Sequence, residues 1–172
     1  MKKTKILTLC AVLTSLALAL SYMERLFPLQ AVIPLPGVKL GLANIVSLVA
    51  LYVLGFKSAY LILVMRCFLT SFFSGSITSL MFSLTGGTLA IIVMALSMRA
   101  PFFSVYGVSI LGAAAHNIGQ ILVSMVLMNS VYILFYLSYL LMVALFTGFA
   151  TGAAASGVIG AFHRLNPTGA NR

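Results

Sequence analysis

Residues 77–98 have the sequence ITSLMFSLTGGTLAIIVMALSM, which contains no charged side chain. A helix that spans a lipid bilayer needs about 20 predominantly apolar residues, because each residue adds about 1.5 Å and the hydrocarbon core is about 30 Å thick. Residues 77–98 meet this requirement without an interruption by proline. They therefore predict a membrane-spanning helix.

Five further apolar runs lie on the two sides of this helix. They cover residues 6–22, 40–54, 58–73, 103–128 and 138–162. The last apolar stretch already begins at residue 131 and would be about 48 Å long as one helix, so we expect residues 131–137 to lie at the membrane interface. The sequence thus predicts a single all-α polytopic membrane domain over residues 1–172, with six transmembrane helices.

The composition agrees with this fold class and excludes several functions. Hydrophobic residues make up 62% of the 172 residues and charged residues only 6%, against about 25% charged residues in soluble domains. Glu24 is the only acidic residue, which excludes paired-carboxylate catalysis and Asp-rich sites for Mg²⁺ and diphosphate. We expect no enzymatic activity, no metal site and no cofactor. The scattered basic residues do not indicate binding of nucleic acid.

Basic residues are distributed unequally between the two predicted sides of the membrane. With the N-terminus in the cytoplasm, the inner side receives Lys2, Lys3, Lys5, Lys57, Arg99, Arg164 and Arg172, and the outer side receives Arg25 and Lys39. This positive-inside bias predicts that both termini are cytoplasmic. One alternative stays open, because a basic start followed by an apolar run and small residues at 17–21 is also typical of a signal peptide. Its removal would leave five spans.

Residues 23–39 form the one long segment between predicted spans that is not continuously apolar. Its prolines prevent a regular helix, and in the predicted topology it lies outside the cell. It is either a plain connector or a lid over an outward-facing pocket, since loops of this length in compact domains are usually functional. The candidate lid residues are Glu24, Arg25, Pro34, Pro36 and Gly37.

Polar side chains at membrane depth indicate a binding site. Arg66 lies near the predicted bilayer centre, where an arginine costs about 2.5–3.5 kcal/mol or more, so it must face the helix bundle. There it pairs with Glu24, bonds to backbone carbonyls, or binds an anionic ligand. Interhelical hydrogen bonds are the alternative for the polar residues near His116. The candidate substrate-binding residues are Lys39, Asn44, Arg66, Thr70, His116, Asn117 and Gln120.

Small residues recur every four positions in the first and last predicted spans. In lipid, where no hydrophobic drive brings helices together, close packing relies on such residues. The first span has Ala11, Ser15 and Ala19 at this spacing, and the last span has five such residues between Ala144 and Gly160. These stripes either pack helices within the bundle or dock another membrane subunit.

Three motifs resemble the Gx transporter family, which is often labelled heptaprenyl diphosphate synthase component I. They are PGVKLGLANIV at residues 36–46, the stretch from Arg66-Cys67 through SLTGG at residues 83–87, and GAAAHNIGQ at residues 112–120. The family is related to the substrate-binding S components of energy-coupling factor (ECF) transporters. The resemblance implies six helices, cytoplasmic termini, a ligand site near the outer face under the first external loop, and a first-helix motif that contacts a transmembrane coupling subunit. Ala11, Ser15 and Ala19 match that motif, with Ser15 in place of alanine.

We therefore expect a multi-pass, substrate-binding subunit of an ECF-type importer in the bacterial plasma membrane. The partners that the resemblance implies are a transmembrane coupling subunit and two ATPase subunits, besides membrane lipid and a small anionic or carbonyl-bearing ligand. The alternative is a non-catalytic accessory protein that handles a quinone or prenyl lipid, in isoprenoid metabolism or in flavin-based extracellular electron transfer. The name synthase does not fit the residues. Polyprenyl synthases are similar in needing Asp-rich motifs to bind Mg²⁺ and diphosphate, and this chain has no Asp.

Overall fold

The computed structural model describes residues 3–25, 39 and 41–165. In this part of the chain it contains six α-helices, one short 3₁₀-helix and no strand. The α-helices are α1 (Lys3–Arg25), α2 (Asn44–Leu54), α3 (Phe56–Ser74), α4 (Ile77–Ser97), α5 (Val105–Met128) and α6 (Phe135–Leu165), and the 3₁₀-helix η2 (Val131–Leu134) precedes α6. The predicted all-α fold class is confirmed.

Local sequence signals explain where the helices between α2 and α5 begin and end. Gly55 (φ 84°) separates α2 from α3, and Gly75 (φ 61°) ends α3 in the left-handed conformation that glycine tolerates best. Ser76 and Ser104 cap α4 and α5, since each hydroxyl accepts a hydrogen bond from the backbone N–H three residues later. The connections are therefore short, and consecutive helices pack as neighbours.

Five of the described α-helices are long and apolar enough to cross a membrane: α1, α3, α4, α5 and α6. The remaining helix, α2, has 11 residues and is about 16 Å long, which is too short to span a bilayer as a helix. The predicted span 40–54 becomes helical only at Asn44, because Gly41 takes a φ of 80°. The sixth crossing and the side of the membrane on which the termini lie stay predictions.

The last helix differs from its predicted span. We expected a span over 138–162, and α6 is one continuous helix of 31 residues that extends beyond it at both ends, with a length of about 46 Å. The placement of residues 131–137 at the interface stays a prediction. No proline interrupts it, and its first glycines are held against α5. A Cβ added at Gly148 would lie 2.6 Å from the Cα of Ile110, so the two backbones are in close contact there. Close packing thus keeps a glycine-containing segment helical.

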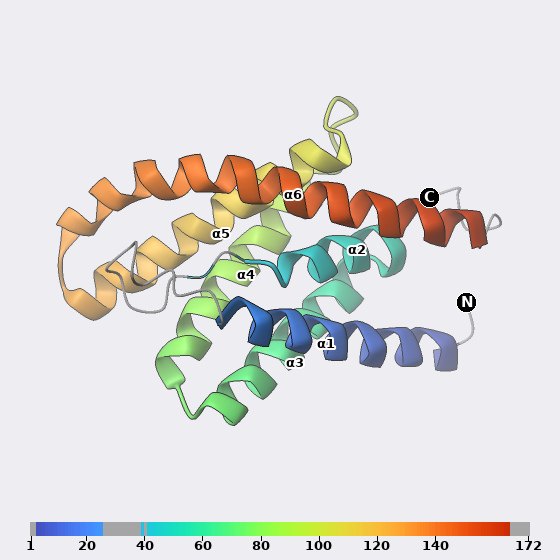
Figure 1. The fold of residues 1–172 in the computed structure, drawn as a ribbon, viewed down its shortest axis with the longest axis horizontal. Coiled ribbons are helices and arrows are strands. Elements are labelled where there is room, and N and C mark those ends of the chain that lie inside the picture. The colour runs from blue at the N-terminus through green and yellow to red at the C-terminus, as the bar shows by residue number, and fades with distance from the viewer. Residues whose placement is uncertain (1–2, 26–38, 40, 166–172) are drawn as a thin grey trace.

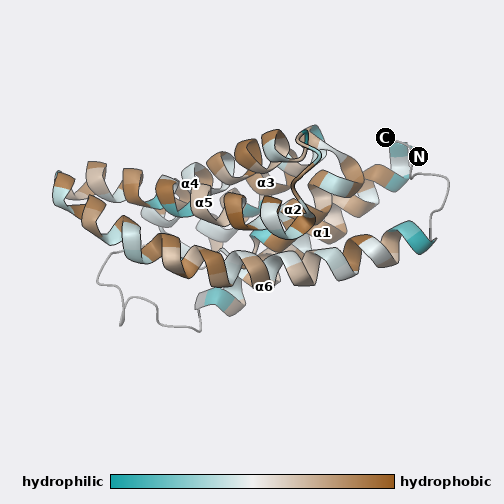
Figure 2. Cartoon of the chain, turned by 90° about the horizontal axis from the view of Figure 1, so that it is seen from above, coloured by the Kyte–Doolittle hydropathy of each residue, from teal (hydrophilic) through white to brown (hydrophobic). Residues whose placement is uncertain are grey.

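The helices are arranged around α2, which contacts all five other α-helices. α1 and α6 lie on opposite sides of α2, and the start of α1 and the end of α6 lie at the same end of the bundle (Figure 1). Hydrophobic residues occur along the lengths of the helices (Figure 2). Of the helices that the structure describes, α1 is the most peripheral, since it contacts α2 and α3 and none of the others.

Candidate functional site

Arg66 projects from the middle of α3 into the bundle, where it is only 6% exposed. Its Nη1 donates a hydrogen bond of 3.3 Å to the hydroxyl of Ser21 on α1. Its Nε has no hydrogen-bond partner in the described part of the chain. A guanidinium carries five N–H donors, and the described residues give Arg66 one side-chain hydrogen bond, so they leave most of its hydrogen-bonding capacity unused.

Glu24 lies in a different place from the one predicted. We expected it in an external lid, but α1 continues through Glu24 to Arg25, because no proline interrupts the helix before residue 26. The Glu24 carboxylate is 5% exposed and accepts a hydrogen bond from the backbone N–H of Gly41. It interacts electrostatically with Arg66 and Lys39, so it supplies a counter-charge to both cations.

Lys39 attaches the segment before α2 to the first half of α4. Its Nζ donates hydrogen bonds to the hydroxyls of Ser79 at 2.8 Å and Ser83 at 2.7 Å. These two serines were not among the predicted site residues. Their spacing of four, which places both hydroxyls on one face of α4, is the signal that could have identified them.

His116 is packed between the backbones of two other segments and is 3% exposed. A Cβ added at Gly41 would lie 3.3 Å from its Cδ2, and a Cβ added at Gly86 would lie 2.9 Å from its Nδ1. A side chain at Gly86 would therefore collide with the imidazole, and one at Gly41 would press against it. Its Nε2 lies 3.1 Å from Nε2 of Gln120, one turn further along α5.

The structure brings six of the predicted residues together in one buried group, which we call the central polar cluster. Gly41 links its members, because this backbone contacts the carboxylate of Glu24 and lies against both Asn44 and His116. Arg66 and Lys39 also interact electrostatically with His116. The cluster consists of Glu24, Lys39, Asn44, Arg66, His116 and Gln120. It holds two permanent cations and one carboxylate, and thus an excess of positive charge.

Two further predicted residues have different surroundings. Thr70 is buried one turn after Arg66 on α3. The amide of Asn117 donates a hydrogen bond of 2.7 Å to the carbonyl of Leu140, so it holds α6 against α5. Among the predicted lid residues, Pro34, Pro36 and Gly37 lie outside the described residues, and for Arg25 only the backbone is described.

The small residues of the first span lie on the outer face of α1. Ala11, Ser15 and Ala19 are exposed, and the Ser15 hydroxyl is bonded to the carbonyl of Ala11 within the same helix. Ser21 and Glu24, which contact the central polar cluster, are buried on the inner side. One face of α1 therefore lies toward the central polar cluster, and a different face carries the small residues.

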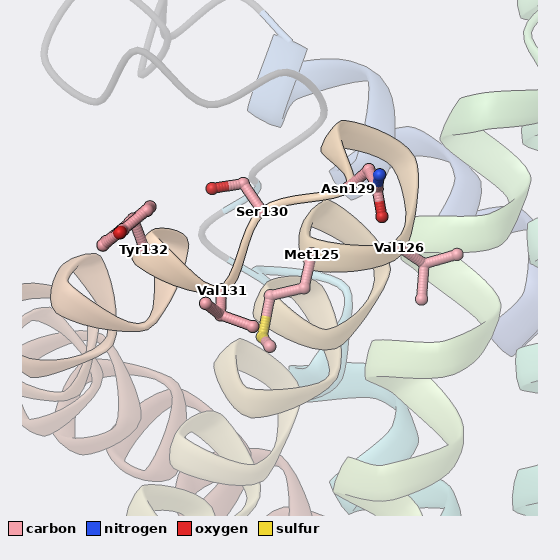
Figure 3. A pocket seen from close by; sticks show the side chains of 6 residues that line it. All are labelled: Met125, Val126, Asn129, Ser130, Val131 and Tyr132. Atoms are coloured by element: carbon pink, nitrogen blue, oxygen red, sulfur yellow. The ribbon is translucent and has the colours of Figure 1, made fainter.

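A separate open pocket of about 540 Å³ lies where α5 ends and η2 begins (Figure 3). No residue of the central polar cluster lines it. Its walls are mostly apolar and aromatic, with one amide and one serine hydroxyl. The lining residues are Met125, Val126, Asn129, Ser130, Val131 and Tyr132.

Glu24→Gln is expected to destabilise the ligand-free protein by about 1–3 kcal/mol. The substitution keeps an oxygen that can accept from Gly41 but removes the negative charge near Arg66 and Lys39, and buried hydrogen bonds to charged groups contribute about this much. Thermal unfolding of the purified variant in detergent measures the loss. Glu24→Ala, which removes the acceptor as well, should unfold at a still lower temperature; an unchanged melting temperature in both variants would contradict the assigned role of Glu24.

Comparison with known proteins gives one match. Residues 13–158 match the family described as Heptaprenyl diphosphate synthase component I. No curated protein and no solved structure was found to match the chain. The matched range covers more than half of the chain and includes every residue of the central polar cluster.

Proposed function

The chain belongs to the heptaprenyl diphosphate synthase component I family, and from this premise we propose that it is the substrate-binding membrane subunit of an ECF-type importer. In this proposal it binds a small anionic or carbonyl-bearing molecule in the bacterial plasma membrane. A transmembrane coupling subunit and two ATPase subunits supply the energy for release. The chain itself is non-catalytic.

The state of Arg66 is the observation that carries this proposal. A guanidinium in the middle of an apolar helix is costly unless it faces a partner. Within the described part of the chain, Arg66 makes one hydrogen bond of 3.3 Å and its Nε has no partner. A ligand with an anionic or carbonyl oxygen would supply the missing acceptors, since charged donors form the strongest hydrogen bonds with such groups. The nearby Lys39 adds to the attraction for an anion.

The outer face of α1 supports the second part of the proposal. Among the described helices, α1 contacts α2 and α3 alone, and we propose that its other side receives a further membrane helix. Ala11, Ser15 and Ala19 on that side are exposed, and small residues at this spacing let two helices approach closely in lipid. We assign the coupling subunit to this face.

Ala11→Leu combined with Ala19→Leu is expected to abolish the complex with the coupling and ATPase subunits. The two larger side chains prevent a close approach of a partner helix, whereas the fold is unaffected because both positions are exposed. Co-purification of the three partner subunits with a tagged chain measures the effect. The control is Ala150→Leu with Ala154→Leu, the same change at exposed positions of α6, which should leave the complex intact. Recovery of a full complex with the α1 variant would contradict the docking assignment.

A lipid-handling accessory role is the second candidate, and the pocket at the end of α5 favours it. The pocket is open and mostly apolar (Figure 3), as a site for a quinone ring or a prenyl chain would be. Mass spectrometry of lipids that co-purify with the protein tests it. A retained quinone or prenyl lipid that is lost on Val126→Asp would support this role, and its absence would count against it.

A further inference from the structure

We infer that the ligand of the central polar cluster carries N–H or O–H donors next to its anionic group, as a hydroxy acid or an amide-bearing carboxylate does. This inference rests on the proposed function, because it specifies the ligand of the same site. It follows from the hydrogen-bonding groups that the folded protein leaves unpaired. Those groups are acceptors as well as donors.

Asn44 provides the first unpaired acceptor. Its Oδ1 is fully inaccessible and has no hydrogen-bond partner in the described part of the chain, although the residue as a whole is 8% exposed. The side chain lies beside Gly41, since a Cβ added there would be 2.9 Å from its Nδ2. A carbonyl oxygen can only accept, so a donor on a bound ligand would satisfy this group.

Gln120 provides the second unpaired acceptor, and it is completely buried. Its Nε2 lies 3.1 Å from Nε2 of His116, so the amide N–H donates to the imidazole in the tautomer whose Nε2 carries no proton. In this arrangement Oε1 has no hydrogen-bond partner among the described residues. Gln120 and Asn44 both lie next to His116, so the two acceptors belong to one site.

Arg66 adds the complementary requirement. Its unpaired Nε is a donor, and together with Lys39 it attracts a negative charge. A ligand that satisfies the whole cluster therefore presents an acceptor to Arg66 and donors to Asn44 and Gln120. A quinone has carbonyl acceptors but no donor, and a prenyl chain has neither, so neither fits the pattern of unpaired groups.

The first experiment uses three pairs of carboxylates in which one member has its N–H or O–H donors replaced by methylated groups. The pairs are lactate and 2-methoxypropanoate, orotate and 1,3-dimethylorotate, and 3,4-dihydroxybenzoate and 3,4-dimethoxybenzoate. Isothermal titration calorimetry with the purified full chain measures the affinities. At least one donor-bearing acid should bind at least about tenfold more tightly than its methylated partner, because each lost hydrogen bond to a buried acceptor is worth about that factor. Equal binding within the pairs, or binding of none of the donor-bearing acids, would overturn the inference.

The second experiment compares the same substitution at two buried asparagines. Asn44→Leu removes an acceptor that has no partner, so the ligand-free protein should melt no lower than the wild type while the affinity for the donor-bearing acid falls at least about tenfold. Asn117→Leu removes a side chain that is hydrogen-bonded to Leu140, so its melting temperature should fall by several degrees. A larger loss of melting temperature in Asn44→Leu than in Asn117→Leu would show that Asn44 is a structural residue.

The outcomes also separate this inference from the proposed function. If the wild type forms the coupling complex but binds methylated and donor-bearing acids equally, the inference about donors is wrong and the importer proposal stands. If no complex forms and no acid binding depends on Arg66, the importer proposal itself is wrong.

Discussion

Arg66→Met is expected to lower the affinity for an anionic ligand by at least about 100-fold. Losing one partner of a buried, charged hydrogen bond costs about 3 kcal/mol, which corresponds to this factor. The ligand-free protein loses one hydrogen bond of 3.3 Å to Ser21 and the electrostatic attraction between Arg66 and Glu24. Removal of a charge whose burial in a membrane-spanning helix is unfavourable opposes this loss.

The matched control for this prediction is Lys57→Met on the same helix. Lys57 lies in the first turn of α3 and is exposed, so its removal should leave the affinity unchanged. Arg66→Lys keeps the charge without the planar guanidinium and should retain an intermediate affinity. Binding of a wild-type ligand, identified by mass spectrometry of the purified protein, is then measured for all three variants by calorimetry. Wild-type affinity in Arg66→Met would remove Arg66 from the site.

The sequence predicted the parts of the fold that depend on composition along one helix. Uninterrupted apolar runs correctly indicated five long helices, and the single mid-helix charge of Arg66 correctly indicated a side chain that faces the bundle. The length of α2 was less well predicted, because apolar content cannot show that Gly41 takes a positive φ and delays the helix to Asn44.

The contacts of the cluster could not be predicted in the same way. Ser21, Ser79 and Ser83 are ordinary residues within apolar runs, and they matter only because packing places them beside Arg66 and Lys39. Glu24 was assigned to a loop since prolines follow it, yet no proline precedes residue 26 and the helix extends through it. Pairing between distant segments is a property of the tertiary structure, which a single sequence does not encode in its local pattern.

Gly119→Leu is expected to have the largest effect on the fold itself. A Cβ at Gly119 would lie 2.7 Å from the Cα and 3.0 Å from the backbone nitrogen of Gly86. The obstacle is backbone, so α4 must move away from α5 to admit a side chain, and overpacking of this kind costs about 3 kcal/mol or more. Because Gly86 also borders the imidazole of His116, the same displacement separates the two sides of the central polar cluster.

The control for Gly119→Leu is Gly157→Leu on α6, since a Cβ at Gly157 would have no atom within 4 Å. Both glycines are helical, so the two variants gain the same intrinsic helix propensity of up to about 1 kcal/mol and differ only in the space around them. Thermal unfolding in detergent should show a melting temperature at least several degrees below the wild type for Gly119→Leu and an unchanged or higher one for Gly157→Leu. Equal melting temperatures would mean that α4 and α5 do not cross at Gly86 and Gly119. In that case His116 would not be held between two glycine backbones, and the cluster would lose its geometric basis.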